Sequence, residues 1–179
     1  AKIQITAANL TRAGDATPAE SVVKEIGGLR IGIFALASPD EVKESGDSAT
    51  KVSDPEAAAA TAVASLRKKS DVVVLLSGLG LRETKRLVRK VEGIDFAVAG
   101  GMGDHPAYSE EAELVGTTRV MQFHREGRYV GRLSLKIVKS TSGVNTIYTM
   151  TDMDKYHTWV FHNGYLISVT DNNSNTIYF

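Results

Sequence analysis

The sequence contains no cysteine. This absence excludes disulfide bonds, thiolate metal ligands and cysteine nucleophiles, but it does not assign a cellular compartment. An excess of charge of one sign is also missing, since 21 lysine and arginine residues balance 21 aspartate and glutamate residues. A balanced chain lacks the basic footprint with which proteins bind nucleic acid or an anionic membrane surface, so we expect neither partner.

Long apolar runs are absent as well. No run approaches the roughly 18 residues that span a bilayer, and no basic start leads into an apolar cleavable segment. We therefore expect a soluble chain that is either mature or truncated. Its 179 residues are enough for one medium-sized domain, or for one domain with a small appendage, and for a sizeable core.

Two short apolar runs mark the centre of the chain, at residues 71–76 and 95–99. Both have the composition of buried parallel strands, and residues 81–91 between them predict the crossover helix. Each run leads into a glycine loop, at residues 77–80 and 100–105. Ligands of α/β proteins bind beyond the carboxyl ends of parallel strands, so these two loops are the first candidates for a site.

The pattern ahead of this centre predicts a strand and a hairpin. We expect a strand over residues 3–8, with Asn9 at its end and a polar loop after it. Two apolar-patterned runs follow, at residues 21–26 and 29–37. They are joined by Gly27-Gly28, a pair that tolerates the positive φ angles of a tight turn, and together they predict a hairpin.

A helix is predicted from the segment Ser-Asp-Pro-Glu at residues 53–56 to about Lys69. Either Ser53 or Asp54 can cap it, the proline suits the first turn, and the glutamate lies three residues after Ser53 as in a capping box. The cationic residues 67–69 suit the negative end of the helix dipole, and a solvated helix end is favoured over a binding patch. Residues 39–52, just before, predict a surface loop with room for a short helix.

The order strand, helix, strand, helix, strand predicts right-handed crossovers and a partly parallel sheet, which is an α/β fold. Beyond Pro106 the pattern changes to strands without helices. These strands are predicted at residues 112–115, 118–123, 129–138, 145–150, 157–162, 165–170 and 175–179. Asn163-Gly164 predicts a type I′ turn.

Composition also changes near residue 139, beyond which the chain has no alanine, arginine or glutamate. We therefore divide the chain into an α/β domain at residues 1–138 and a hairpin-rich tail or appended module at residues 139–179. About 40 residues of hairpins do not easily build a core of their own. The tail is expected to pack on the first domain or on another chain.

Six segments, taken in order, carry a family resemblance: residues 7–10, 28–33, 53–58, 71–77, 93–101 and 129–133. On these segments residues 3–138 resemble the second half of the metallophosphoesterase domain of the 5′-nucleotidase family, a group of calcineurin-like phosphoesterases. The likeness does not extend to the tail from Lys139. It implies a layered α/β sandwich with a mixed sheet, followed here by an all-β tail.

The resemblance also implies two divalent metal ions, held by Asp, Asn and His side chains, which activate a water and stabilise phosphoryl charge. This sequence departs from that pattern. The first ligand motifs would lie before Ala1, Gly78 stands where the family has a histidine, and Met102 and Asp104 stand at the two histidines of a Gly-Gly-His-x-His motif. A glycine has no side chain, and a thioether is a poor ligand for the metals of phosphoester chemistry. The ligand set for the usual bimetal site is therefore absent from this chain alone.

Two weaker kinds of site remain. Asp104 and His105 could bind a metal, as could Asn9 at the end of its strand, although a polar turn before Pro106 also explains the first two. The glycine loops could hold an anion with their N–H groups, although a close-packed turn is the favoured use. The candidate anion-binding residues are Ser77, Gly78, Gly80, Gly100 and Gly101.

Three functions are weighed. We favour a degenerate relative that has lost stand-alone metal-dependent hydrolysis and acts as a binding or assembly module. The second is a phosphoester or 5′-nucleotide hydrolase completed by a missing N-terminal segment or by a partner chain. The third is a structural subunit that self-associates through exposed strands, above all the hairpins after Gly143. The resemblance implies a periplasmic or extracellular location.

Overall fold

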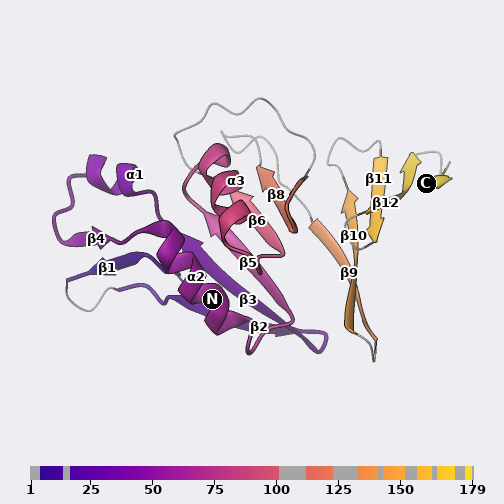
Figure 1. Ribbon diagram of the computed structural model, residues 1–179, viewed down its shortest axis with the longest axis horizontal. Coiled ribbons are helices and arrows are strands. Elements are labelled where there is room, and N and C mark those ends of the chain that lie inside the picture. The colour runs from indigo at the N-terminus through magenta and orange to yellow at the C-terminus, as the bar shows by residue number, and fades with distance from the viewer. Residues whose placement is uncertain are drawn as a thin grey trace. The chain divides into compact units, whose positions relative to one another are not determined.

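The computed structural model describes both main chain and side chains for residues 5–13, 17–100 and 112–122. Farther along it describes the main chain of five strands between residues 133 and 178. The chain forms two compact units, residues 1–122 and residues 123–179 (Figure 1).

The first unit alternates strands and helices in the predicted order. Its elements are β1 (Leu10–Arg12), β2 (Ser21–Ile26), β3 (Leu29–Leu36), α1 (Pro39–Glu44), β4 (Thr50–Val52), α2 (Pro55–Leu66), β5 (Val72–Ser77), α3 (Leu81–Lys90), β6 (Phe96–Ala99), β7 (Glu113–Val115) and β8 (Thr118–Gln122). A six-stranded sheet has the order β2-β3-β5-β6-β8-β7. Its four central strands are parallel, and β2 and β7 join antiparallel at the edges. The predicted α/β fold with a mixed sheet is confirmed.

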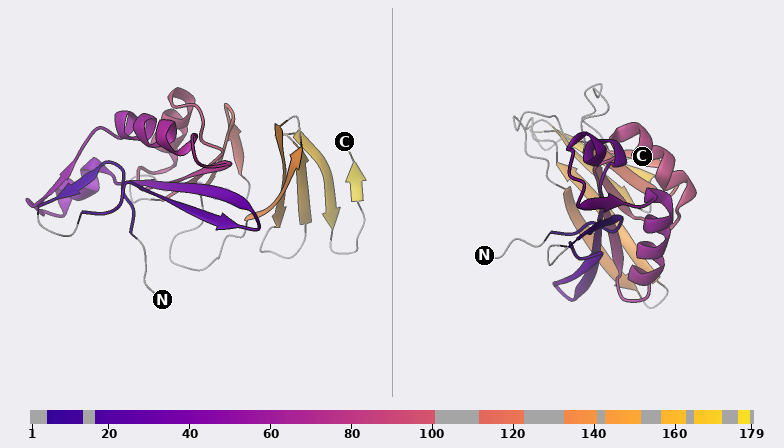
Figure 2. Two further views of the ribbon diagram at one scale, coloured as in Figure 1. Left: turned by 90° about the horizontal axis from the view of Figure 1, so that it is seen from below. Right: turned by 90° about the vertical axis from the view of Figure 1, so that its left-hand side faces the viewer.

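Helices α2 and α3 cover the same face of this sheet (Figure 2). The chain moves in one direction across the sheet, from β3 to β5 to β6, and right-handed crossovers then place both helices on one side. The core lies between these helices and the sheet, where Phe34, Leu66 and Leu75 are fully buried. Gly32 lets α2 approach β3, because a Cβ there would lie 2.6 Å from Ser70 Oγ and 2.9 Å from Leu66 Cδ2.

The hairpin of β2 and β3 is confirmed, with Gly27 and Gly28 at φ angles of 60° and 77°. The strand predicted over residues 3–8 is wrong for the described residues 5–8, where Thr6 forms only an isolated bridge to Ala19. A strand instead occupies the expected polar loop as β1, and it pairs antiparallel with β4, which lies in the second expected loop. Such short strands are stabilised by pairing with a distant segment, and the local sequence does not reveal that segment.

The turn before β4 is built by Asp47. Its carboxylate accepts hydrogen bonds from Thr50 Oγ1 at 2.8 Å and from the Ala49 N–H at 3.0 Å. These bonds stabilise the ionised form and hold the pKa of the Asp47 carboxyl below its ordinary value. Helix α1, at the start of the same stretch, agrees with the expected short helix.

Helix α2 begins where the sequence predicted, and Asp54 is its cap, accepting a hydrogen bond from the Ala57 N–H at 2.8 Å. The capping box with Ser53 does not form, because Glu56 instead pairs with Lys90 of α3 at 2.6 Å. The helix ends at Leu66, three residues earlier than expected. Arg67 lies just beyond the end of the helix. Its side chain is not only solvated, because it donates a hydrogen bond to the Gly93 carbonyl oxygen and forms an ion pair with Asp95.

The second unit is an antiparallel meander in the order β13-β12-β11-β10-β9. Its strands are β9 (Leu133–Ser140), β10 (Gly143–Thr151), β11 (His157–His162), β12 (Tyr165–Asp171) and β13 (Thr176–Tyr178). The domain boundary expected between residues 138 and 139 lies inside β9, whose pairing with β10 places it in the second unit. The type I′ turn predicted at residues 163–164 lies outside the described residues. Across it, His162 pairs with Tyr165.

Candidate functional site

The carboxyl ends of β3, β5 and β6 meet at one edge of the six-stranded sheet, because these strands are parallel. Three loops leave this edge: residues 37–38 after β3, residues 78–80 after β5, and Gly100 after β6. Asn9 joins them from the N-terminal segment, through contacts with Ala37. The structure thus brings together five of the predicted site residues: Asn9, Ser77, Gly78, Gly80 and Gly100.

Asn9 is 1% exposed, and both the nitrogen and the oxygen of its carboxamide form hydrogen bonds. Its Nδ2 donates to the Ala37 carbonyl oxygen at 2.9 Å, and its Oδ1 accepts from the Ala37 N–H at 2.8 Å. Its own carbonyl oxygen accepts from the Ser53 N–H at 2.8 Å. Asn9 thus acts as a clasp: its side chain holds the loop after β3, and its main-chain carbonyl oxygen holds Ser53 just before α2.

A chain of hydroxyl groups fixes the loop between β5 and α3. Thr84 Oγ1 lies 2.7 Å from Ser77 Oγ and 2.6 Å from the Gly80 carbonyl oxygen. A threonine hydroxyl has one hydrogen, so if Thr84 donates to Gly80, the hydrogen between the two hydroxyls comes from Ser77. Ser77 Oγ also accepts from the Leu79 N–H at 3.3 Å. Both hydroxyl side chains are buried, so this network is internal.

The main-chain N–H groups of this edge are also used internally. Gly78 donates to the Leu36 carbonyl oxygen at 2.8 Å, Gly80 to that of Gly100 at 2.7 Å, and Gly100 to that of Ser77 at 2.7 Å. An anion cradle needs N–H groups that point outward without a partner. The N–H groups of Gly78, Gly80 and Gly100 point inward to protein acceptors, as in a close-packed turn.

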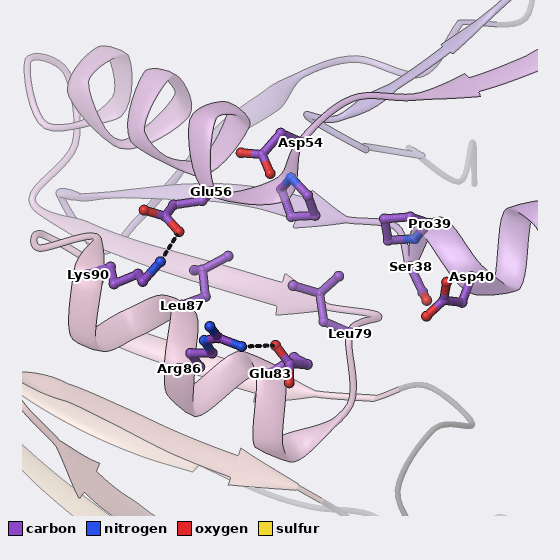
Figure 3. A pocket seen from close by; sticks show the side chains of 11 residues that line it. Ser38, Pro39, Asp40, Asp54, Glu56, Leu79, Glu83, Arg86, Leu87 and Lys90 are labelled. Carbon is purple, nitrogen blue, oxygen red and sulfur yellow. Dashed lines mark hydrogen bonds and ion pairs between the residues drawn. The ribbon is translucent and has the colours of Figure 1, made fainter.

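A cavity that sequence reasoning did not identify lies between the starts of α1 and α2 and one side of α3, along which it extends to Lys90 (Figure 3). Its volume is about 400 Å³, and its charged lining includes two ion pairs. Glu56 pairs with Lys90 at 2.6 Å, and Glu83 with Arg86 at 3.9 Å. Three segments far apart in sequence form this cavity, and no local pattern in the sequence brings them together.

Comparison with known proteins bears on the fold. No protein-family model matches the sequence, and no curated protein matches it. Among solved structures, the chain is similar to the sulfate thiohydrolase SoxB of Thermus thermophilus, with a TM-score of 0.58 and 17% identity over 98% of this chain and 28% of that one. For the NAD nucleotidase NadN of Haemophilus influenzae the values are 0.56 and 14%, over 99% and 34%. The chain has the fold of a 5′-nucleotidase-type metallophosphoesterase half domain.

A third similar structure is a 5′-nucleotidase precursor, also of Thermus thermophilus, with a TM-score of 0.50 and 21% identity. It is covered over 34% of its length, so the chain spans about a third of each of these three structures. Identities this low establish the fold and not an activity. The matched span includes 98% of this chain, and it therefore reaches into the strands beyond Lys139, where the sequence resemblance ended.

The described residues of this metallophosphoesterase-like fold do not fit the metal pair that the family implies. At Gly78, the family's histidine position, a Cβ would lie 3.0 Å from the Leu36 carbonyl oxygen. Within residues 5–13, 17–100 and 112–122, no group of three or more His, Asp or Glu side chains is arranged to hold a metal ion. The other predicted candidates, Gly101, Asp104 and His105, lie outside the described residues, as does Met102.

Proposed function

We propose that this metallophosphoesterase-like chain is a binding or assembly module that does not catalyse metal-dependent hydrolysis by itself. The observation that carries the proposal is the closed loop after β5. Its N–H groups at Gly78 and Gly80 donate to protein acceptors, and a Cβ at Gly78 would meet main chain at 3.0 Å. A catalytic metal site needs ligand side chains at the carboxyl ends of these strands; the glycine at position 78 supplies none, and a side chain there would crowd main chain.

We expect no turnover of p-nitrophenyl phosphate, bis-p-nitrophenyl phosphate or AMP above the protein-free rate, with Mn²⁺, Zn²⁺ or Co²⁺ added. Absorbance at rising protein concentration measures the first two reactions, and released phosphate measures the third. Circular dichroism of the same sample verifies that the protein is folded. Turnover that scales with protein concentration and is abolished by EDTA would overturn the proposal.

A second candidate is a phosphoester or 5′-nucleotide hydrolase completed by another segment or by a partner chain. It is favoured by the similarity to a NAD nucleotidase and a 5′-nucleotidase precursor, of which the chain covers 34% each. Coding sequence upstream of Ala1 that carries Asp-x-His and Gly-Asn-His-Glu motifs would support it. Gly78 counts against full activity even then, because the position still lacks a ligand.

We propose that assembly takes place through the outer strands of the sheets, which pair either with a second copy of this chain or with a strand of a partner chain. The outer strands of the two larger sheets are β2 and β7 in the first unit and β9 and β13 in the second. Unpaired edges present N–H and C=O groups to another strand. We expect the apparent mass in light scattering to rise with protein concentration. A constant monomer mass would exclude self-association.

The location proposed with this role is periplasmic or extracellular. The resemblance to the 5′-nucleotidase family supports it, and the similar structures include a 5′-nucleotidase precursor. No helix in the described part of the chain is long and apolar enough to cross a membrane.

A further inference from the structure

The loops after β3 and β5 touch through main chain at Gly78. Its N–H donates to the Leu36 carbonyl oxygen at 2.8 Å. A Cβ on residue 78 would lie 3.0 Å from that same oxygen, 3.6 Å from the Ser38 nitrogen and 3.8 Å from Ala37 Cα. All three neighbours are main-chain atoms. A main chain cannot rotate away from a new methyl group as the end of a flexible side chain can.

The loop after β3 is held on its far side. Asn9 bonds both the N–H and the carbonyl oxygen of Ala37, at 2.8 and 2.9 Å. Ala37 lies between Leu36 and Ser38, the residues that a side chain at position 78 would displace. Movement of this loop away from Gly78 would therefore disrupt the hydrogen bonds of a buried carboxamide, which is costly because the freed groups would stay away from water.

The loop after β5 is also held in place by hydrogen bonds. Ser77 accepts from the Gly100 N–H through its carbonyl oxygen and contacts Thr84 through its hydroxyl, at 2.7 Å in each case. Gly80 donates to the Gly100 carbonyl oxygen at 2.7 Å and has a φ angle of 79°, which a residue with a Cβ rarely adopts. Both sides of the contact are thus fixed by hydrogen bonds.

We infer that Gly78 closes a main-chain joint between the two loops, and that a ligand-bearing side chain at position 78 strains this joint by displacing main-chain atoms of the loop after β3. The inference rests on the proposed function and deepens it. The position that the resemblance assigns to a metal-binding histidine serves here to fasten β3 to β5. Substitution with histidine alone therefore does not restore a metal ligand to this site.

A neighbouring glycine offers a matched control. A Cβ at Gly100 would lie 3.6 Å from the Ser77 carbonyl oxygen, which is ordinary van der Waals contact. Its φ angle is not in the positive range. Gly100 also lies at the same sheet edge and takes part in the same network, through its hydrogen bonds to Ser77 and Gly80. Gly100→Ala therefore tests the cost of a methyl group beside these loops without a steric conflict with any described residue.

The test compares the full chain with Gly78→Ala, Gly78→His and Gly100→Ala by thermal unfolding. We expect Tm to fall by about 5 °C for Gly78→Ala, by more for Gly78→His, and by less than about 2 °C for Gly100→Ala. Addition of Zn²⁺, Mn²⁺ or Co²⁺ is expected to shift the Tm of Gly78→His no more than that of the parent. If Gly78→His fails to fold, Gly78→Ala still decides the outcome.

A Tm for Gly78→Ala within about 2 °C of the parent would overturn the inference. A gain in Tm on metal addition that only Gly78→His shows would also overturn it. These results are independent of the hydrolysis assay. Phosphatase activity of the parent would defeat the proposed function and leave the joint in place, whereas a harmless methyl group at position 78 would defeat the joint and leave unchanged the lack of a ligand side chain at Gly78.

Discussion

Replacement of Asn9 with alanine is expected to lower the free energy of unfolding by about 2–4 kcal/mol. The variant removes two hydrogen bonds to Ala37 and leaves that residue's N–H and carbonyl oxygen without their side-chain partner. Since Asn9 is 1% exposed, water does not readily replace the lost groups. Urea unfolding followed by circular dichroism measures the change as a lower midpoint with an unchanged slope.

Asn9→Asp separates the clasp from a metal-ligand role. The new carboxylate can still accept from the Ala37 N–H, but it opposes the Ala37 carbonyl oxygen where Nδ2 donated. That repulsion, together with burial, raises the pKa of the new carboxyl in the folded state. A raised folded pKa means that stability is greater at acidic pH and is lost as pH rises. We therefore expect Asn9→Asp to be less stable than the parent at pH 7 and to recover toward pH 4.

A loss below about 0.5 kcal/mol for Asn9→Ala would contradict the clasp. If Asn9 were instead needed only as a metal ligand, both variants would match the parent in EDTA and differ from it only after a divalent metal is added. The structural role predicts the same loss with and without EDTA.

Replacement of Asp95 with alanine should lower the free energy of unfolding by about 2–4 kcal/mol. Its Oδ2 accepts from the Val73 N–H at 2.7 Å and lies 2.8 Å from Arg67 Nη2. Val73 is fully buried, so alanine leaves its N–H without that acceptor. The same carboxylate links the end of α2 to the start of β5, and its loss affects two elements. Urea unfolding again measures the change.

Two matched variants divide this effect. Asp95→Asn keeps an oxygen for the Val73 N–H and removes the charge, so we expect about half the loss. Arg67→Met keeps much of the apolar stem and removes both the ion pair, whose partners are 34% and 29% exposed, and the hydrogen bond from Nε to the Gly93 carbonyl oxygen, so we expect a loss of about 1–2 kcal/mol. Equal losses for Asp95→Ala and Arg67→Met would show that the ion pair, and not the hydrogen bond to Val73, is what matters.

The hairpin, the two longer helices and the central strands of the first unit were predictable because each carries its own local signal. The β-branched run before Ser77 predicts β5, the Ser-Asp-Pro-Glu segment at residues 53–56 predicts the start of α2, and Gly27-Gly28 predicts the hairpin. Burial on both faces makes a parallel strand a continuous apolar run, and helix caps depend on residues close in sequence. Structure and sequence agree wherever the cause is local.

The pairing of β1 with β4 was not predictable, because it joins segments about 40 residues apart that have polar, loop-like composition. The role of Arg67 was missed for a similar reason. Its sequence context is a cationic helix end, yet its partners Gly93 and Asp95 arrive from beyond α3. From sequence alone, a charged residue at a helix end is predicted to be solvated. Only the folded structure shows which distant segments contact it.

The loop after β5 shows most directly what each level determined. By itself the sequence determined that position 78 has no side chain, that glycine loops follow β5 and β6, and that these loops lie at the carboxyl edge of a parallel sheet. Only the tertiary structure decided whether those glycines form an open cradle or a closed joint. The deciding groups are the Leu36 and Gly100 carbonyl oxygens, which accept the N–H groups of Gly78 and Gly80. The reason is physical: main-chain donors look alike in every sequence, and only packing determines which acceptor each one meets.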